Sequence, residues 1–193
     1  MVINQKICVF CASKEGTNEE FQKLAKELGA KIAKKGLGLI YGGAQVGLMG
    51  QVADAALQNQ GEVIGVIPES LADREIAHPR VNSLIVTTDM HERKRTMYDL
   101  ADAFIALPGG MGTLEEVFEA ATWTKLGMHR NGMHKPVVLL DNGEFWQDMI
   151  RFLDFQVATG FVSQKSREIV CSAYTVDKAI ELAMKIPQSN NDI

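Results

Sequence analysis

The stretch LGLIYGGAQVGLMG at residues 37–50 combines an apolar β-type run with a glycine-rich turn and the start of a helix. Leu37–Tyr41 is the strand candidate, and the turn and helix start follow over Gly42–Gly50. Glycine permits positive φ and lets a ligand approach backbone N–H groups closely. The helix that follows presents unpaired N–H donors and the positive end of its dipole. This stretch therefore predicts one strand–turn–helix unit of an α/β fold, with a turn suited to an anion.

Short β-type runs alternate with helical patterns along the rest of the chain. The first helical segment carries an apolar stripe from Phe21 to Ile32, opens with the capping-box pattern Thr17-x-x-Glu20 and stops at Gly36. Apolar strands that alternate with amphipathic helices predict an α/β fold, a Rossmann-like doubly wound parallel sheet with helices on both faces. The predicted strands are Ile7–Cys11, Leu37–Tyr41, Val63–Ile67, Leu84–Val86, Phe104–Leu107, Val137–Leu140 and Ile169–Cys171.

Length and composition favour one compact globular unit. The chain has 193 residues, 46% of them hydrophobic and 23% charged, and we expect a single domain over 1–193 with a loose tail at 187–193. The formal net charge of -4 argues against a nucleic-acid surface, which needs clustered cations. The sequence starts without signal-peptide features and has no apolar run long enough to span a bilayer. We therefore expect a cytoplasmic protein with no nucleic-acid or membrane partner.

The pattern Cys8-Val9-Phe10-Cys11 matches C-x-x-C, but it falls in a predicted buried strand. Redox pairs of that kind sit at the start of a helix, whereas residues three apart on a strand point to opposite faces. Cys8 and Cys11 are therefore predicted to be small core residues.

Four unusual loops follow predicted strands and converge on one sheet edge. They begin at Ala12, Gly42, Asp89 and Pro108. Ligands of such sheets bind beyond the carboxyl ends of the strands, near a topological switch point. Two of the loops are glycine-rich and precede helices, but Gly43-x-x-x-Gly47-x-x-Gly50 misses the dinucleotide spacing G-x-G-x-x-G. This pattern favours the phosphate of a mononucleotide.

Arg93 and Lys94 lie on or beside the apolar stripe of a helix that starts near Asp89. A cation drawn toward an interior needs an anion, and beside two phosphate-type loops a substrate anion is the favoured partner. The alternative is that both side chains reach out to solvent from the helix edge.

Glu115 and Glu116 follow the second glycine-rich loop. Glu116 completes Thr113-x-x-Glu116, itself a capping-box pattern, so a structural role is the alternative to a catalytic one. A carboxylate in a pocket could stabilise an oxocarbenium-like sugar or activate water. Glu75 is a further carboxylate, in the long connection after the third strand.

The four histidines show no metal-ligand spacing, and no G-x-S-x-G motif is present. We therefore expect neither a metal or other cofactor nor a serine nucleophile.

Three motifs occur in order along the chain. They are Tyr41-Gly42-Gly43…Val46-Gly47-Leu48-Met49-Gly50, Met90-His91-Glu92-Arg93-Lys94 and Pro108-Gly109-Gly110-x-Gly112-Thr113-x-x-Glu116. Together they resemble the LONELY GUY (LOG) family of cytokinin riboside 5′-monophosphate phosphoribohydrolases, long mislabelled as lysine decarboxylases. The resemblance runs from about Ile7 to about Ile186. It implies a Rossmann-like fold and a homodimer or larger assembly.

The resemblance also implies roles for individual residues. Arg93 and Glu116 match the catalytic pair. The implied nucleotide contacts are Glu75, Lys94, Gly110, Met111, Gly112, Thr113, Leu114, Glu115 and Thr122. Phosphate and ribose are expected to be enclosed by Ser13 and by the loop that contains Gly43, Gly47 and Gly50.

The sequence departs from the family pattern at a few places. Ala12-Ser13-Lys14 replaces the commoner Gly-Ser-Ser, and Met111 stands where an aromatic residue is common. Leu126–Pro136 is longer than the usual Leu-Gly-x-His-x-Lys-Pro, near the expected pocket rim or dimer contact.

The expected function is hydrolysis of the N-glycosidic bond of a purine nucleoside 5′-monophosphate, either AMP or an N6-modified AMP. Two alternatives stay open. One is a non-enzymatic carrier of a phosphorylated cofactor, like the molybdenum-cofactor carriers, and the other is a nucleoside deoxyribosyltransferase. Lysine decarboxylation is disfavoured because the resemblance supplies no pyridoxal-phosphate lysine.

Overall fold

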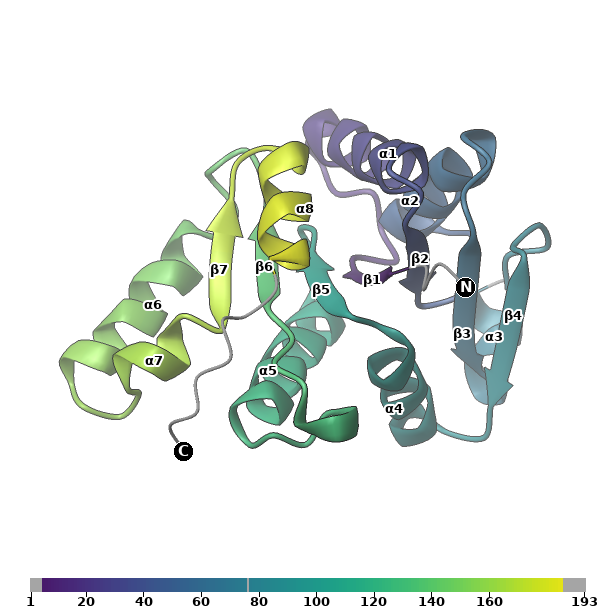
Figure 1. Ribbon diagram of the computed structural model, residues 1–193. Coiled ribbons are helices and arrows are strands. Elements are labelled where there is room, and N and C mark those ends of the chain that lie inside the picture. The colour runs from purple at the N-terminus through teal and green to yellow at the C-terminus, as the bar shows by residue number, and fades with distance from the viewer. Residues whose placement is uncertain (1–4, 76, 186–193) are drawn as a thin grey trace.

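A computed structural model describes residues 5–75 and 77–185, and within them the strands form a seven-stranded, all-parallel sheet (Figure 1). The sheet order is β4-β3-β2-β1-β5-β6-β7. The strands are β1 Lys6–Phe10, β2 Gly38–Tyr41, β3 Val63–Pro68, β4 Ser83–Thr87, β5 Ala103–Ala106, β6 Val137–Leu140 and β7 Val170–Ala173. The helices are α1 Glu19–Lys34, α2 Gly47–Gln58, α3 Glu69–Glu75, α4 Met90–Leu100, α5 Met111–Lys125, the 3-10 helix η1 Arg130–Gly132, α6 Gln147–Ala158, α7 Gln164–Arg167 and α8 Val176–Met184.

The predicted doubly wound sheet is confirmed, with each predicted strand shifted by at most two residues at its ends. The predicted start of the first helix is wrong in detail. Asn18, not Thr17, caps α1, because its side-chain oxygen accepts a hydrogen bond from the N–H of Glu20. The predicted stop is confirmed, since Gly36 follows the helix at a φ of +70°. The single-domain expectation stays a prediction, and the tail at 187–193 lies outside the described residues.

Two apolar clusters, one on each face of the sheet, form the core. α1, α2 and α8 cover one face, whereas α4, α5 and α6 cover the other (Figure 1). Side chains along β1 alternate between the clusters, so that Cys8 and Cys11 pack on opposite faces as predicted. Both cysteines are unpaired, and burial raises the pKa of each thiol, with the nearby Glu116 carboxylate adding to it. They are core thiols and not a redox pair.

The longer segment Leu126–Pro136 lies at the C-terminal end of α5. Lys135 is fully buried, and its Nζ donates to the carbonyl oxygens of Tyr98 and Ala101, at 2.8 and 2.6 Å. Its own carbonyl accepts a hydrogen bond from Thr124 Oγ1 at 2.8 Å. Lys135 thus joins the last turn of α4 to the end of α5, and burial lowers the pKa of its ammonium group.

The strand order places a topological switch point beside β1. Cys8 of β1 pairs with Ile40 of β2 on one side and with Phe104 of β5 on the other. The loops that follow β1 and β5 therefore leave the sheet toward opposite faces, and a crevice between such loops is where these sheets bind ligands. None of the helices in the described ranges is long and apolar enough to cross a membrane.

Candidate active site

A pocket of about 360 Å³ opens at the carboxyl ends of the strands, next to the switch point. Its volume falls within the roughly 300–1,000 Å³ typical of small-molecule sites. The walls come from the loops that follow β1 and β2 and from the first turns of α2, α4 and α5. The lining residues are Val9, Cys11, Ala12, Ser13, Lys14, Gly42, Met49, Met90, Arg93, Gly110, Met111, Gly112, Thr113, Glu115 and Glu116.

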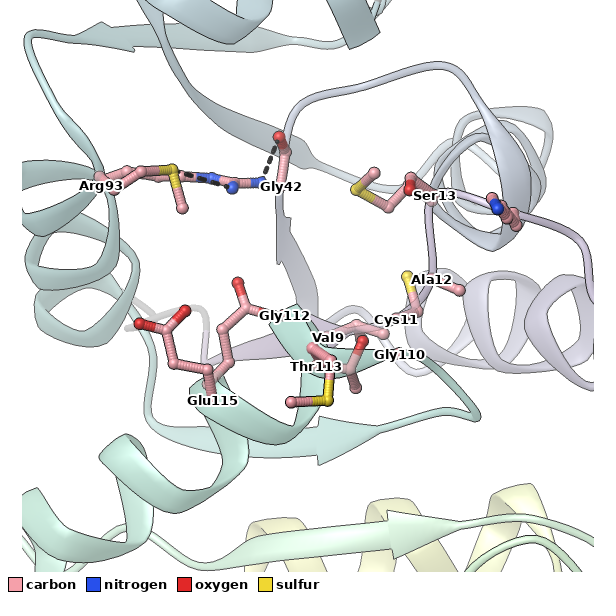
Figure 2. Close-up of a pocket in the computed structure, with 15 residues that line it drawn as sticks. Val9, Cys11, Ala12, Ser13, Gly42, Arg93, Gly110, Gly112, Thr113 and Glu115 are labelled. Carbon is pink, nitrogen blue, oxygen red and sulfur yellow. Dashed lines mark hydrogen bonds between the residues drawn. The ribbon is translucent and has the colours of Figure 1, made fainter.

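The start of α5 forms one wall of this pocket, as Figure 2 shows. The helix begins at Met111, and its N-cap is Gly110, which has no side chain to cap the first N–H groups. A Cβ atom added to Gly110 or Gly112 would meet nothing within 4 Å, so the space above both residues is open. Unpaired N–H donors and the positive end of the helix dipole then face an open volume, an arrangement that favours an anion.

Arg93 lies across the pocket from Gly110 and Gly112 (Figure 2). Its side chain is only 6% exposed. The guanidinium donates from Nε to the Val66 carbonyl at 3.0 Å and from Nη2 to the Gly42 carbonyl at 2.9 Å. A Cβ at position 42 would lie 2.2 Å from that Nη2, so any other residue there would displace the guanidinium from this position. Its Nη1 lies 3.7 Å from the Met90 sulfur, and Arg93 lines the pocket together with the carboxylates of Glu115 and Glu116.

Lys94, the next residue, is also buried but is not among the residues that line the pocket, and its ammonium group reaches α5. Its Nζ lies 2.8 Å from Glu115 Oε1 and 2.9 Å from Glu119 Oε2. Burial lowers the pKa of Lys94, but the hydrogen bonds to Glu115 and Glu119 outweigh it and raise the pKa overall. We predicted a substrate anion as the partner of this buried cation, whereas the structure pairs it with two carboxylates of the protein. The helical periodicity correctly predicted that Lys94 is buried, but it could not identify Glu115, 21 residues later in the chain, as its partner.

Glu115 and Glu116 both line the pocket. The capping-box alternative for Thr113 and Glu116 is wrong, because α5 begins at Met111 and Thr113 is its third residue. Thr113 is buried with its hydroxyl against Gly109, and Glu116 lies in the second turn, half-buried. Helix capping therefore does not explain a carboxylate at position 116.

The loop after β1 closes another side of the pocket with Ser13 and Lys14. Its position is fixed by the start of α2, where the Leu48 N–H donates to the Ala12 carbonyl at 3.1 Å. Gly47 has a φ of +58°, and a Cβ there would lie 2.3 Å from the backbone carbon of Ser13. The glycine at position 47 is thus required for the first loop to approach α2 closely.

Comparison with known proteins gives this site a context. A family model described as "possible lysine decarboxylase" matches residues 49–183. A cytokinin riboside 5′-monophosphate phosphoribohydrolase of Rhodococcoides fascians is 46% identical over 170 residues, which cover 86% of this chain and 84% of the relative. The rice enzyme of the same name, LOG, is 44% identical over 184 residues, which cover 95% of this chain and 73% of the relative.

The chain belongs to the LOG family. Its fold is also shared by solved structures with other names. The molybdenum cofactor carrier protein of Chlamydomonas reinhardtii superposes with a TM-score of 0.70 at 27% identity, over 92% of this chain and 94% of that one. The molybdenum cofactor binding protein of Rippkaea orientalis gives the same TM-score and identity, over 94% and 96%. The carriers thus share the fold at lower sequence identity than the LOG enzymes.

The LOG fold brings most of the predicted site residues to one pocket. Those that line it are Ser13, Arg93, Gly110, Met111, Gly112, Thr113, Glu115 and Glu116. Those that do not line it are Gly43, Gly47, Gly50, Lys94, Leu114 and Thr122. Glu75 is the last residue of α3, and its side chain lies outside the described part of the structure. The nucleotide contacts assigned to all these residues stay predictions.

The sequence reasoning missed an apolar wall of the pocket, made by Val9, Cys11, Met49 and Met90. Each stands near the carboxyl end of a strand or in the first turn of the following helix, which is the only signal that could have found them.

Over residues 5–75 and 77–185, no three His, Cys, Asp or Glu side chains gather closely enough to hold a metal ion.

Proposed function

We propose that this LOG-family chain hydrolyses the N-glycosidic bond of a purine nucleoside 5′-monophosphate, AMP or an N6-modified AMP. The products are the free base and ribose 5-phosphate. One observation carries the proposal: the anion-favouring start of α5 and the non-capping carboxylate of Glu116 line the same pocket. The phosphoribohydrolase names of relatives at 44–46% identity support it.

The 5′-phosphate would bind at the start of α5. The open space above Gly110 and Gly112 admits an anion to the N–H groups, and Ser13 adds a hydroxyl from the first loop. Anchoring the phosphate contributes binding energy that orients the sugar and distorts it toward the transition state.

The chemistry needs a group that stabilises positive charge at the anomeric carbon. As the C1′–N9 bond breaks, its electron pair goes to the purine and the ribose becomes oxocarbenium-like. The Glu116 carboxylate would stabilise this cation and orient a water molecule for attack at C1′. The attacking water gives its oxygen and one proton to the ribose hydroxyl, while its other proton balances the one that the departing base acquires.

Arg93 would serve the purine end of the substrate. It lies on the wall opposite the start of α5 (Figure 2), so a phosphate on that helix leaves the guanidinium facing the ribose and base. A cation there stabilises negative charge that develops on the departing base.

The first test compares AMP with adenosine. A charge-assisted hydrogen bond contributes about 1.5–3 kcal/mol, so loss of two such bonds to the phosphate should lower kcat/KM roughly a hundredfold or more. The measurement is release of free base from a panel of purine nucleotides and nucleosides by the purified protein. Equal kcat/KM on AMP and adenosine would remove the phosphate anchor from the proposal.

The same assay addresses the second candidate, a cofactor carrier, which the similarity to the Chlamydomonas carrier protein favours. A carrier needs the anion-binding helix but has no use for Glu116. Tight binding of nucleotides without any release of base would support the carrier. Transfer of the sugar to an added second base would instead identify a transferase.

We also propose a homodimer formed through the exposed face of α5 and the segment that follows it. Met111, Phe118, Leu126, Met128 and Met133 are apolar and exposed there, whereas Trp123 packs partly on the core. Thr122 lies on the same face, nine residues or about 13 Å along the helix from Thr113. Thr122 would then lie in the proposed interface.

Light scattering at micromolar concentration should give twice the mass of one chain, 21.2 kDa. A Phe118→Glu variant should shift the mass toward the monomer, because it buries a charge in the proposed interface. A monomeric mass for the unchanged protein would contradict this assembly.

The cytoplasmic location stays a prediction.

A further inference from the structure

A cluster of charged side chains ties α4 to α5 beside the pocket. Lys94 bridges Glu115 and Glu119, which lie one helical turn apart, and Tyr98 donates from its hydroxyl to Glu119 Oε2 at 2.8 Å. Lys94 and Tyr98 are likewise one turn apart on α4. Two residues of one helix thus hold two residues of the other, and Lys94 is only 5% exposed.

This cluster is adjacent in sequence to the proposed catalytic pair. Arg93 precedes Lys94 in the chain, and Glu116 follows Glu115. A shift of α4 along α5 would therefore change the position of Arg93 relative to Glu116. Glu115 lines the pocket, whereas Glu119 is not among the lining residues.

We propose that Lys94 is a positioning residue, which holds α4 against α5 through Glu115 and Glu119 and so sets the geometry of Arg93 and Glu116. The proposal rests on the proposed function of the pocket. It differs from the role implied by the family resemblance, in which Lys94 contacts the nucleotide. Two carboxylates of the protein pair with the Lys94 ammonium group, and they balance its buried charge.

The deciding variant is Glu119→Gln. Glutamine still accepts the hydrogen bond from Tyr98 but loses the charge that holds Lys94. We expect kcat to fall about five- to tenfold and the Kd for ribose 5-phosphate, measured by calorimetry, to change less than about twofold. Lys94→Met should lower kcat by about ten- to a hundredfold with a similarly small change in Kd, since a displacement of about 1 Å at a reacting centre can cost a hundredfold.

Two further variants make the test specific. The double variant Lys94→Met/Glu119→Gln should be no worse than Lys94→Met by more than about twofold, because both changes remove the same interaction. Lys94→Arg keeps a donor for each carboxylate and should recover part of kcat. The matched control is Lys31→Met, which breaks a 2.9 Å pair with Asp177 between α1 and α8, away from the pocket, and should leave kcat unchanged.

Three results would overturn the proposal. One is a tenfold weaker binding of ribose 5-phosphate by Lys94→Met with an unchanged Glu119→Gln, which makes Lys94 a nucleotide ligand. Another is unchanged kcat in the folded fraction of both variants, with only the melting temperature lowered, which makes the cluster purely structural. The third is full additivity in the double variant. Failure of the proposed function is distinct, because the unchanged protein would then release no base from any nucleotide.

Discussion

Glu116→Gln is expected to lower turnover of AMP by about a hundredfold or more while the protein stays folded. Glutamine keeps the volume of the side chain but removes the charge, and acid–base or charge-stabilising groups of this kind contribute at least about a hundredfold. Glu116 lies in the second turn of α5, beyond the N-cap at Gly110, and we expect the Glu116→Gln protein to fold. The measurements are kcat, the melting temperature and the Kd for ribose 5-phosphate.

The Kd for ribose 5-phosphate separates an effect of Glu116→Gln on catalysis from an effect on binding. The phosphate is proposed to bind at the start of α5, so the Kd for ribose 5-phosphate should change only slightly in Glu116→Gln. Glu181→Gln is the matched control, since it removes an exposed carboxylate from α8, where Glu181 pairs with Lys178. A fully active Glu116→Gln protein would leave the mechanism without its carboxylate.

Arg93→Ala should lose both turnover and stability. Loss of a donor that stabilises developing charge costs about a hundredfold or more in kcat. The change also leaves the carbonyl oxygens of Gly42 and Val66 without their guanidinium donor, which we expect to cost about 1–3 kcal/mol of unfolding free energy. Denaturant unfolding and base-release kinetics measure the two effects on one preparation.

The affinity of Arg93→Ala for ribose 5-phosphate then assigns the guanidinium to one end of the substrate. We expect that affinity to stay within about threefold, because ribose 5-phosphate lacks the purine that Arg93 is proposed to serve. A tenfold weaker affinity would instead place the phosphate on Arg93. Lys26→Ala, at an exposed position on α1, controls for the loss of a surface cation.

The parallel sheet could be predicted from sequence because its strands are short apolar runs between amphipathic helices, whereas the strand order came from the structure alone. Periodicity also placed Arg93 and Lys94 near the interior, where both are buried. Periodicity could not show which groups each of the two side chains contacts. Arg93 is held by carbonyl oxygens of β3 and of the turn after β2, and Lys94 by carboxylates on α5, and these distant partners depend on how whole helices pack.

Local patterns were ambiguous at helix starts for a similar reason. Thr17-x-x-Glu20 and Thr113-x-x-Glu116 both match a capping box, yet Asn18 and Gly110 are the residues at the N-caps. The pattern states which residues can cap, but the helix start depends on tertiary packing of the first turn. At α5 that difference of three residues moves Glu116 from a cap into the second turn.

The anchoring of Arg93 on main-chain oxygen atoms has a consequence for mutational robustness. Every amino acid supplies a carbonyl oxygen, so side-chain substitutions at Val66 leave that acceptor in place, and sequence drift in β3 does not remove it. Gly42 is the exception, because a side chain there would displace the guanidinium from its two carbonyl acceptors. Lys94, one residue later, depends on two side-chain carboxylates, each of which a single codon change can remove. Arg93 and Lys94 therefore differ in their sensitivity to mutation elsewhere in the chain. The acceptors of Arg93 belong to the backbone, whereas Lys94 keeps its partners only while Glu115 and Glu119 are both retained.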